Sequence, residues 1–326
     1  MSKFKKKLIT AKTSVNTLLT KLNLISRYKT YKDEPLLLTA VLIADLHVDG
    51  DRYRDRNNKI RMAFSKLSHS KRKLDGVIMA GDITNSGHIY EYTHLKRFVR
   101  KYLNALSIIP QMGNHDARSC SIYPYFDEAT ELFDDFCKFC KQEKSKHVNY
   151  YYTVLNNCYI IMLATDKLPD DGAYISKAQA EWFEKVLVEA EKSQKPIIVV
   201  NHQPPLKRNK AKVEFLYDEG KEIENIMLRH SNSDTPIIYI SGHMHKLGEN
   251  TYEKVENIHY LNLPSVLYGP EDEKKGAFGF MLEIYNKSIV LRCRDFESGK
   301  WVDEYLYEIP WVNNMTRRKK QYEVKF

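Results

Sequence analysis

From Leu36 onward, apolar and polar positions follow two different patterns along the chain. Short continuous apolar runs are typical of buried strands, and longer segments between them, such as NKIRMAFSKLS and HIYEYTHLKRFVRKYL, repeat their apolar residues with helical spacing. Strands that alternate with amphipathic helices predict βαβ units and an α/β fold with a parallel sheet. The strand-like runs are LLLTAVLIA, GVIMA, SIIPQM, PIIVV and PIIYIS.

Other patterns predict the remaining elements. The stretch YYTVLNNCYIIMLAT predicts a hairpin that turns at Asn156 and Asn157. Ser176, with Gln179 three residues later, predicts a capping box at the start of a helix. The last third, over residues 258–310, is rich in strand-like runs and has no strong helical pattern, so it predicts a second, mostly antiparallel sheet.

No internal repeat or Pro/Gly/Ser-rich linker divides the body of the chain, which we interpret as one domain over residues 35–312. Residues 1–34 are a basic N-terminal extension, in which apolar residues from Leu8 to Ile25 fall near a helical stripe flanked by lysines. Such a helix either packs on the body or lies on a membrane surface. Residues 313–326 are a basic C-terminal tail.

Composition narrows the class of protein. With 326 residues, 43% hydrophobic and 29% charged, the chain is long and apolar enough to fold around a core. Its net charge of +9 favours anionic partners, which include phosphate esters, nucleic acid and membrane headgroups. The N-terminal lysines are not followed by the apolar region of a signal peptide, and the longest apolar run is about half of the roughly 18 residues that a membrane span needs. We therefore expect a cytoplasmic protein.

The cysteines agree with a reducing compartment, because the five of them form no regular framework. Cys137 and Cys140 form a CxxC on one face of a predicted helix, together with Phe133 and Phe136. A zinc site would need a second such pair, which the sequence lacks. We interpret the two cysteines as core residues.

Polar motifs directly follow each of the strand-like runs. Because the carboxyl ends of strands in an open α/β sheet line the ligand crevice, loops after different strands can converge on one site. Carboxylates and imidazoles without thiolates suit divalent Mn, Fe, Zn, Co or Ni, and a shared aspartate can bridge two ions about 3.5–4 Å apart. The motifs are Asp45-Leu46-His47, Gly81-Asp82, Gly113-Asn114-His115-Asp116, Asn201-His202 and Gly242-His243-Met244-His245.

The spacing within the first and last motifs is also informative. Their paired polar residues are two positions apart, which in a strand-like backbone places both side chains on one face. The glycines let the backbone turn tightly and come close to ions and substrate. Each motif alone is common, but the set, with each member after its own strand, predicts a metal site.

In this order and completeness the motifs resemble the signature of the calcineurin-like metallophosphoesterases, over about residues 36–265. The resemblance implies a four-layer α/β/β/α fold, which is a mixed two-sheet β-sandwich flanked by helices. It also implies two divalent metal ions, with Asp82 bridging them. One ion would be bound by Asp45, His47, Asp82 and His245, and the other by Asp82, Asn114, His202 and His243.

The resemblance further implies hydrolysis of a phosphate ester, with a metal-bridging hydroxide attacking phosphorus in line. Asn114 would offer its neutral carbonyl oxygen to a metal. His115 would face the phosphorus, where it would donate a proton to the leaving oxygen or hydrogen-bond a phosphoryl oxygen. Asp116 would orient the ring of His115 and favour its protonated form.

The substrate is less well defined. The segment GDITNSGHIYEY resembles the cyclic-nucleotide phosphodiesterase-like branch of the family, which favours a phosphodiester or a small phosphomonoester. Arg118, Tyr123 and Lys167 lie in loops beside the metal motifs, where they are either ordinary loop residues or contacts for the distal part of the substrate.

Two other functions stay open. The basic charge favours a metal-dependent nuclease, although the sequence has no stripe of alternating basic and aromatic residues. A non-catalytic scaffold of the same fold is disfavoured, because all the expected ligand types are present. The sequence does not predict the oligomeric state.

Overall fold

The computed structural model describes residues 30–32, 34–50, 54–68, 74–118, 126–156, 158–192, 194, 196–231, 235–267 and 277–311. The chain divides into two compact units, residues 1–33 and 34–326, and the fold described here is that of the second. The apolar stripe of the N-terminal extension and the basic C-terminal tail lie outside the described residues. Within the described residues, no helix is both long and apolar enough to span a membrane.

One six-stranded sheet contains the first three strands of the chain, which form one half of it. Strands β1 (Leu36–Ile43), β2 (Gly76–Ala80) and β3 (Ser107–Gln111) run parallel, with Ala40 opposite Gly76 and Gly76 opposite Ser107. The other side of β1 pairs antiparallel with β12 (Phe278–Tyr285), which is followed by β13 (Ser288–Asp295) and β14 (Trp301–Pro310).

A second six-stranded sheet is mostly parallel. Its order is β10 (Tyr252–Val255), β11 (Ile258–Asn262), β9 (Ile237–Ser241), β7 (Ile197–Val200), β5 (Cys158–Met162) and β4 (Tyr151–Leu155). The predicted hairpin is confirmed as the antiparallel pair of β4 and β5. A short parallel pair, β6 (Ala173–Ile175) and β8 (Leu216–Asp218), lies apart from both sheets.

The prediction that the last third forms its own antiparallel sheet is wrong. Strands β12 to β14 extend the first sheet instead, and β11 joins the second sheet parallel to β9. The reason is that β2 covers only one edge of β1, so the other edge needs a partner for its backbone groups, and β12 provides it. The five strands that precede the polar motifs are divided between the two sheets: β1, β2 and β3 lie in the first, and β7 and β9 lie in the second.

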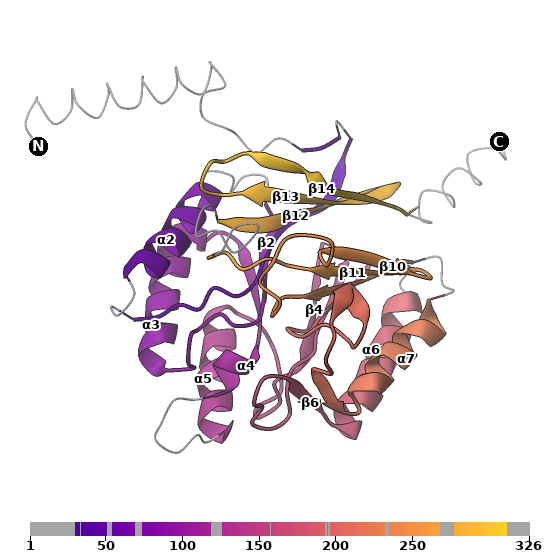
Figure 1. Cartoon of the computed structure of the whole chain (residues 1–326), viewed down its shortest axis with the longest axis horizontal. Coiled ribbons are helices and arrows are strands. Elements are labelled where there is room, and N and C mark those ends of the chain that lie inside the picture. The colour runs from indigo at the N-terminus through magenta and orange to yellow at the C-terminus, as the bar shows by residue number, and fades with distance from the viewer. Residues whose placement is uncertain are drawn as a thin grey trace, which may run out of the picture. The chain divides into compact units, whose positions relative to one another are not determined.

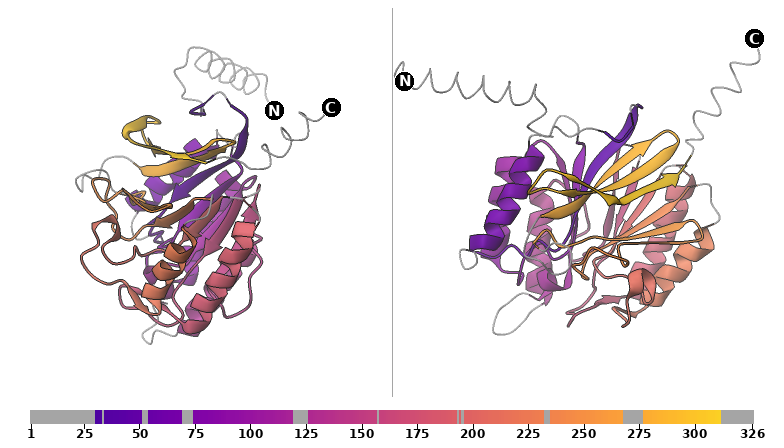
Figure 2. Two further views of the ribbon diagram at one scale, coloured as in Figure 1. Left: turned by 90° about the vertical axis from the view of Figure 1, so that its right-hand side faces the viewer. Right: turned by 45° about the horizontal axis from the view of Figure 1, so that its top comes forward.

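Helices cover both outer faces of the paired sheets, so the fold has four layers (Figure 1). On one side lie α2 (Arg54–Ser68), α3 (Ile89–Phe98) and α5 (Phe126–Phe139), and on the other lie α6 (Lys177–Lys192) and α7 (Gly220–His230). The two sheets between them can be followed in the turned views of Figure 2. This is the predicted mixed two-sheet sandwich flanked by helices.

The helices dock through apolar stripes that recur with helical spacing. In α2 the buried residues are Ile60, Ala63, Phe64 and Leu67. In α6, Phe183 and Leu187 pack into one cluster with strand residues such as Tyr239. Each fully buried side chain of this size contributes about 1.5–3 kcal/mol to the stability of the fold.

Two smaller predictions can be compared with the contacts. Cys137 and Cys140 are free, buried cysteines of the helical layer, in agreement with their interpretation as core residues. The Ser176 hydroxyl accepts a hydrogen bond from the Gln179 amide, as an N-cap does, at 3.1 Å. The Gln179 side chain does not complete a capping box; it donates to the Ala164 carbonyl at 2.8 Å and to Asp166 at 2.7 Å.

Candidate metal centre

The five polar motifs converge at the carboxyl ends of their strands. β1 leads to Asp45 and His47, β2 to Asp82, β3 to Asn114, β7 to His202 and β9 to the histidines of the GHMH motif. Neighbouring loops are joined by backbone hydrogen bonds: Asp45 donates to the Gly81 carbonyl at 3.1 Å, and His47 donates to the Asp82 carbonyl at 2.9 Å. The two sheets thus present their loops to one shared site.

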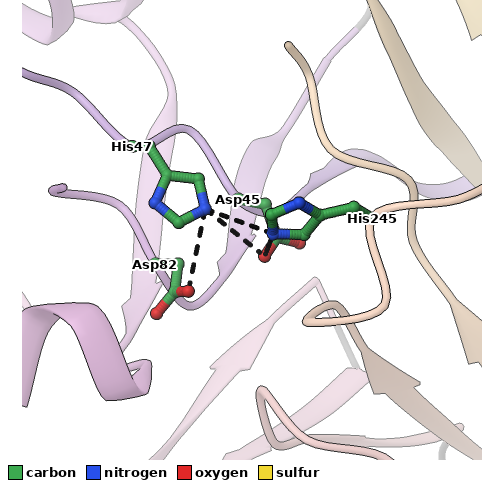
Figure 3. A group of neighbouring side chains, drawn as sticks. All are labelled: Asp45, His47, Asp82 and His245. Atoms are coloured by element: carbon green, nitrogen blue, oxygen red, sulfur yellow. Dashed lines mark hydrogen bonds and ion pairs between the residues drawn. The ribbon is translucent and has the colours of Figure 1, made fainter. Parts of the chain in front are cut away.

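One cluster of potential ligands is compact. Asp45, His47, Asp82 and His245 each offer one ligand atom, and these atoms all lie within 4.8 Å of one another. Figure 3 shows the two imidazoles turned toward the carboxylates. Nε2 of His245 lies 3.0 Å from Oδ1 of Asp45, and Nε2 of His47 lies 3.8 Å from Oδ2 of Asp82. Such a set of carboxylates and imidazoles suits a divalent transition metal.

A second group of polar side chains adjoins this cluster at Asp82. Nε2 of His202 lies 3.1 Å from Oδ2 of Asp82, and the ring centroids of His202 and His243 are 5.3 Å apart. Asn114 is buried, and its Oδ1 accepts a hydrogen bond from Gln203 at 3.3 Å. Asp82 therefore lies between His47 and His202, where one carboxylate could serve two ions.

Tight turns of the backbone direct the candidate ligand side chains toward the site. Asp45, His47, Asp82, His243 and His245 all have positive φ angles, between 42° and 66°, so the backbone at DLH and HMH is left-handed and not strand-like. The expectation that extended backbone places each pair on one face is therefore wrong. A left-handed conformation costs about 1–3 kcal/mol for a residue other than glycine, and such residues gather at functional sites.

Glycine is required where the loops approach the ligands most closely. Gly81 has a φ of 82°, and a Cβ atom there would lie 2.5 Å from Nδ1 of His202. A Cβ atom on Gly242 would lie 2.5 Å from Oδ2 of Asp45. A larger residue at either position would push an imidazole or a carboxylate out of place.

The carboxylates of the site stay ionised and attract positive charge. Burial alone would lower the pKa of His202, but Asp82 and Asp45 outweigh it and raise that pKa to about 10. Burial likewise opposes ionisation of Asp82, yet the charge of His202 holds the Asp82 pKa below its usual range. By contrast, burial lowers the pKa of His47 and of His243 to about 4, so both rings are neutral near pH 7. A neutral imidazole is the form that binds a metal.

One buried atom tests whether a metal fits here. Nε2 of His202 is buried and makes no hydrogen bond with any described residue. Its other ring nitrogen, Nδ1, lies 2.8 Å from the Ala80 carbonyl and so carries a proton, which leaves Nε2 as the nitrogen that would bind a metal once the metal displaces the second proton of the ring. An imidazole oriented by a backbone carbonyl, with its other nitrogen toward two carboxylates, is the arrangement of a metal-binding histidine. The residues present fit a metal ion.

His115 lies beside the compact cluster and is oriented by a backbone carbonyl. Its Nδ1 is 2.6 Å from the Asn85 carbonyl oxygen, which can only accept, so Nδ1 carries a proton. Its Nε2 lies 3.9 Å from Oδ2 of Asp82 and accepts from Nη1 of Arg118 at 3.2 Å. The ring therefore presents Nε2 to the metal cluster.

Asp116 makes contacts other than the predicted one to the His115 ring. Its buried carboxylate accepts hydrogen bonds from the backbone amides of Gly113, Ile83 and Thr84 and from the Thr84 hydroxyl, at 2.6–3.2 Å. Asp116 thus joins the loop after β3 to the loop after β2, and the Asn85 carbonyl orients the ring instead. The short helix α4 (Asn114–Ala117) holds His115 and Asp116 on different sides.

The three candidate substrate contacts lie in different surroundings. Arg118 contacts His115 and also donates to the Asp170 carbonyl at 2.9 Å, so it lies at the edge of the site. Lys167 pairs with Asp218 at 2.8 Å, and its ammonium lies over the Tyr174 ring. Tyr123 lies outside the described residues. Of the three, the structure brings Arg118 to the metal cluster.

Sequence reasoning missed several residues that contact the site. Gln203 directly follows His202, so it could have been found by extending that motif by one residue, whereas Asn85 contacts His115 through its backbone carbonyl, which no residue type marks. Asp171, whose carboxylate lies 3.7 Å from Nε2 of His243, comes from the loop between β5 and β6. No sequence pattern marks it, because that loop reaches the site only through the packing of the sheets.

Proteins similar in sequence include two phosphodiesterases. A 3′,5′-cyclic-nucleotide phosphodiesterase of Nostoc sp. is 22% identical over 244 residues, which are 72% of this chain and 81% of that protein. A glycerophosphodiester phosphodiesterase of Enterobacter lignolyticus is 22% identical over 220 residues, 64% of this chain and 73% of that protein.

The fold is also found among solved structures. A dimetal phosphatase from Danio rerio aligns with a TM-score of 0.58 at 15% identity, covering 85% of this chain and all of that one. The family model of the calcineurin-like phosphoesterases matches residues 38–247, which include every motif of the site. The chain belongs to the calcineurin-like phosphoesterase family.

Proposed function

We propose that the protein is a dinuclear metal-dependent phosphohydrolase that cleaves a small phosphodiester, with a small phosphomonoester as the second candidate substrate. The observation that carries the proposal is the compact cluster of Asp45, His47, Asp82 and His245, in a chain of a phosphoesterase family. The buried Nε2 of His202, which lies 3.1 Å from Asp82, supports a second ion. The names of the two sequence relatives favour a diester.

The first ion would be held by the compact cluster. The second would be held by Asp82, Asn114, His202 and His243. When bound, divalent ions such as Mn, Fe, Zn, Co or Ni supply an acidified water as the nucleophile and offset the charge of the phosphate. Asp82, held ionised and buried, is the residue best placed to bind both ions.

His115 would act on the leaving oxygen or on a phosphoryl oxygen. The Asn85 carbonyl holds its Nδ1 proton, so the reactive nitrogen is Nε2, which lies on the side of Asp82. Arg118 lies against that same nitrogen and is half-exposed, so its guanidinium can bind the phosphate of an arriving substrate. His115 then hydrogen-bonds the substrate through Nε2, and in its protonated form donates a proton there.

The test combines metal analysis of the purified protein with hydrolysis of bis-p-nitrophenyl phosphate and p-nitrophenyl phosphate in added Mn. We expect about two transition-metal ions per chain and faster cleavage of the diester. Faster cleavage of the monoester would make the protein a phosphatase. Cleavage of single-stranded DNA under the same conditions would favour the nuclease. Bound metal without any turnover would favour the scaffold, and a protein that binds no metal would contradict the proposal.

A further inference from the structure

Asp171 places a carboxylate beside the second group of metal-ligand candidates. It lies in the loop between β5 and β6, and its side chain is 62% exposed. Oδ2 lies 3.7 Å from Nε2 of His243, and Oδ1 lies 3.5 Å from Nδ2 of Asn114. Oδ1 is also 3.9 Å from Nη2 of Arg118. All three distances are at or beyond the limit of a hydrogen bond, so none of these groups holds the carboxylate closely.

The separation from His243 is one that two ligands of the same ion have. Nitrogen and oxygen ligands lie about 2.0–2.2 Å from a transition metal, so two of them on one ion are roughly 3–4 Å apart. Within the compact cluster, Nε2 of His245 lies 3.0 Å from Oδ1 of Asp45, and Nε2 of His47 lies 3.9 Å from the same oxygen. The distance of 3.7 Å between Asp171 and His243 falls in this range.

The loop that carries Asp171 is fixed to the site at several points. Its first part is anchored by Asp166, whose Oδ2 accepts from the Ser176 amide at 2.8 Å and from Gln179. At its end, the Asp171 carbonyl accepts from Nε2 of Gln203 at 3.4 Å, and the same Nε2 contacts Asn114. The loop therefore holds the Asp171 backbone in place while its side chain stays accessible.

Charge gives the carboxylate a function at this position. The compact cluster contains Asp45 in addition to the shared Asp82, whereas the second group contains Asp82 alone and otherwise neutral ligands. A divalent ion at the second position would be bound by half as many carboxylates as its neighbour. A further carboxylate would correct this difference, because hard divalent cations prefer oxygen anions.

We propose that Asp171 is an additional, exchangeable carboxylate ligand of the second metal ion, an inference that rests on the dinuclear centre of the proposed function. Its carboxylate binds the ion beside His243 and Asn114 in the substrate-free enzyme. Because the side chain is exposed, it can yield its place to a phosphate oxygen without disturbing the core. Asp171 thus holds the second ion in the enzyme between turnovers.

The test is a comparison of Asp171→Asn with Asp170→Asn, which removes the same charge from the neighbouring exposed position of the loop. Each protein is stripped of metal, dialysed against a series of Mn concentrations and analysed for bound Mn per chain. In Asp171→Asn we expect the first ion to bind as in the wild type and the second to need about 10- to 100-fold more Mn. In Asp170→Asn both ions should bind as in the wild type.

Several outcomes would overturn the inference. If Asp171→Asn binds both ions with wild-type affinity, Asp171 is not a ligand. If both variants weaken the second ion equally, the cause is the charge of the loop and not a bond to the metal. A wild-type protein that binds fewer than two Mn ions would overturn the dinuclear centre itself, which separates failure of the proposed function from failure of this inference.

Discussion

The loops of the two sheets contribute differently to the candidate metal centre. The first sheet supplies both carboxylates of the cluster, Asp45 and Asp82, together with His47 and Asn114. The motifs of the second sheet supply imidazoles, from His202, His243 and His245. Among the motif residues all the carboxylates thus come from the first sheet, and the proposed ligand Asp171 adds one from a loop of the second.

The second sheet also depends on the first for the orientation of its ligands. Nδ1 of His202 contacts the Ala80 carbonyl at the end of β2, and the backbone amide of His243 donates to Asp45 at 3.1 Å. The loops of the first sheet are in turn held together by Asp116. We therefore expect changes in the first sheet to affect the whole centre, and changes in the second to affect one ion.

Asp82→Asn should have the largest effect, because the shared carboxylate lies between both groups of ligands. We expect loss of both ions and a fall in turnover of at least about 1,000-fold, since each ion loses charge neutralisation and the nucleophile loses its activation. Metal analysis and hydrolysis of bis-p-nitrophenyl phosphate measure the two effects. Asp303→Asn, at an exposed position of β14, is the control for loss of one charge. An Asp82→Asn protein that keeps one ion at full affinity would show that Asp82 does not bridge.

His202→Ala should separate the two positions. The change removes a ligand of the second ion but leaves the compact cluster intact, so the first ion should stay and the affinity for the second should fall by more than about 100-fold. Equilibrium dialysis against Mn measures both affinities. His259→Ala, which removes a buried histidine of β11 outside the site, controls for the cost of deleting a buried ring. Loss of both ions in His202→Ala would contradict the expectation that a change in the second sheet affects only one ion.

His115→Ala should lower turnover without changing the metal content. His115 belongs to a loop of the first sheet but contacts Asn85 and Arg118, so its removal should leave the ligands in place. We expect turnover to fall by about 100-fold or more, the usual contribution of a general acid or base. His230→Ala, on α7, is the matched control. If the metal content falls together with turnover, His115 supports the metal centre and is not a catalytic group.

Local sequence patterns predicted which polar motifs would converge, because each motif follows a strand whose apolar run is visible in the sequence. Strand pairing was less predictable: β12 joins β1 across more than 200 residues of sequence, and apolar periodicity does not report which edge a strand will occupy. Contacts such as that of Asn85 with His115 were missed for a related reason. A backbone carbonyl carries no residue-type signal, so only the folded loop reveals it.

A substitution of Glu91 would measure how much the loops of the first sheet contribute to stability when no metal is bound. Its Oε2 accepts from the backbone amides of Ser86 and His88 at 2.9 and 3.1 Å, which fixes the segment that directly follows Asn85. Burial raises the pKa of Glu91 to about 7. Its other oxygen, Oε1, is buried and makes no hydrogen bond with the described residues. The folded protein therefore holds Glu91 protonated at a pH where the unfolded chain ionises it.

The sign of the pH dependence follows from this difference. Between pH 4.5, the ordinary pKa of the group, and about pH 7, the unfolded state loses the proton first, so the Glu91 contribution to the free energy of unfolding falls as pH rises and is constant above pH 7. Glu91→Gln removes this dependence. We expect the variant to gain on the order of 2 kcal/mol relative to the wild type between pH 5 and pH 8, allowing for partial screening by water.

Urea unfolding of the metal-free proteins at both pH values measures that gain, with Glu181→Gln on the exposed face of α6 as the control. Parallel stability curves for the wild type and Glu91→Gln would show that Glu91 ionises equally in both states. A gain in stability that is seen in Glu91→Gln and not in the control would instead show that the charge of Glu91 disfavours folding above pH 7. Because metal is absent from this measurement, it separates the stability of the first-sheet loops from the binding of ions by their ligands.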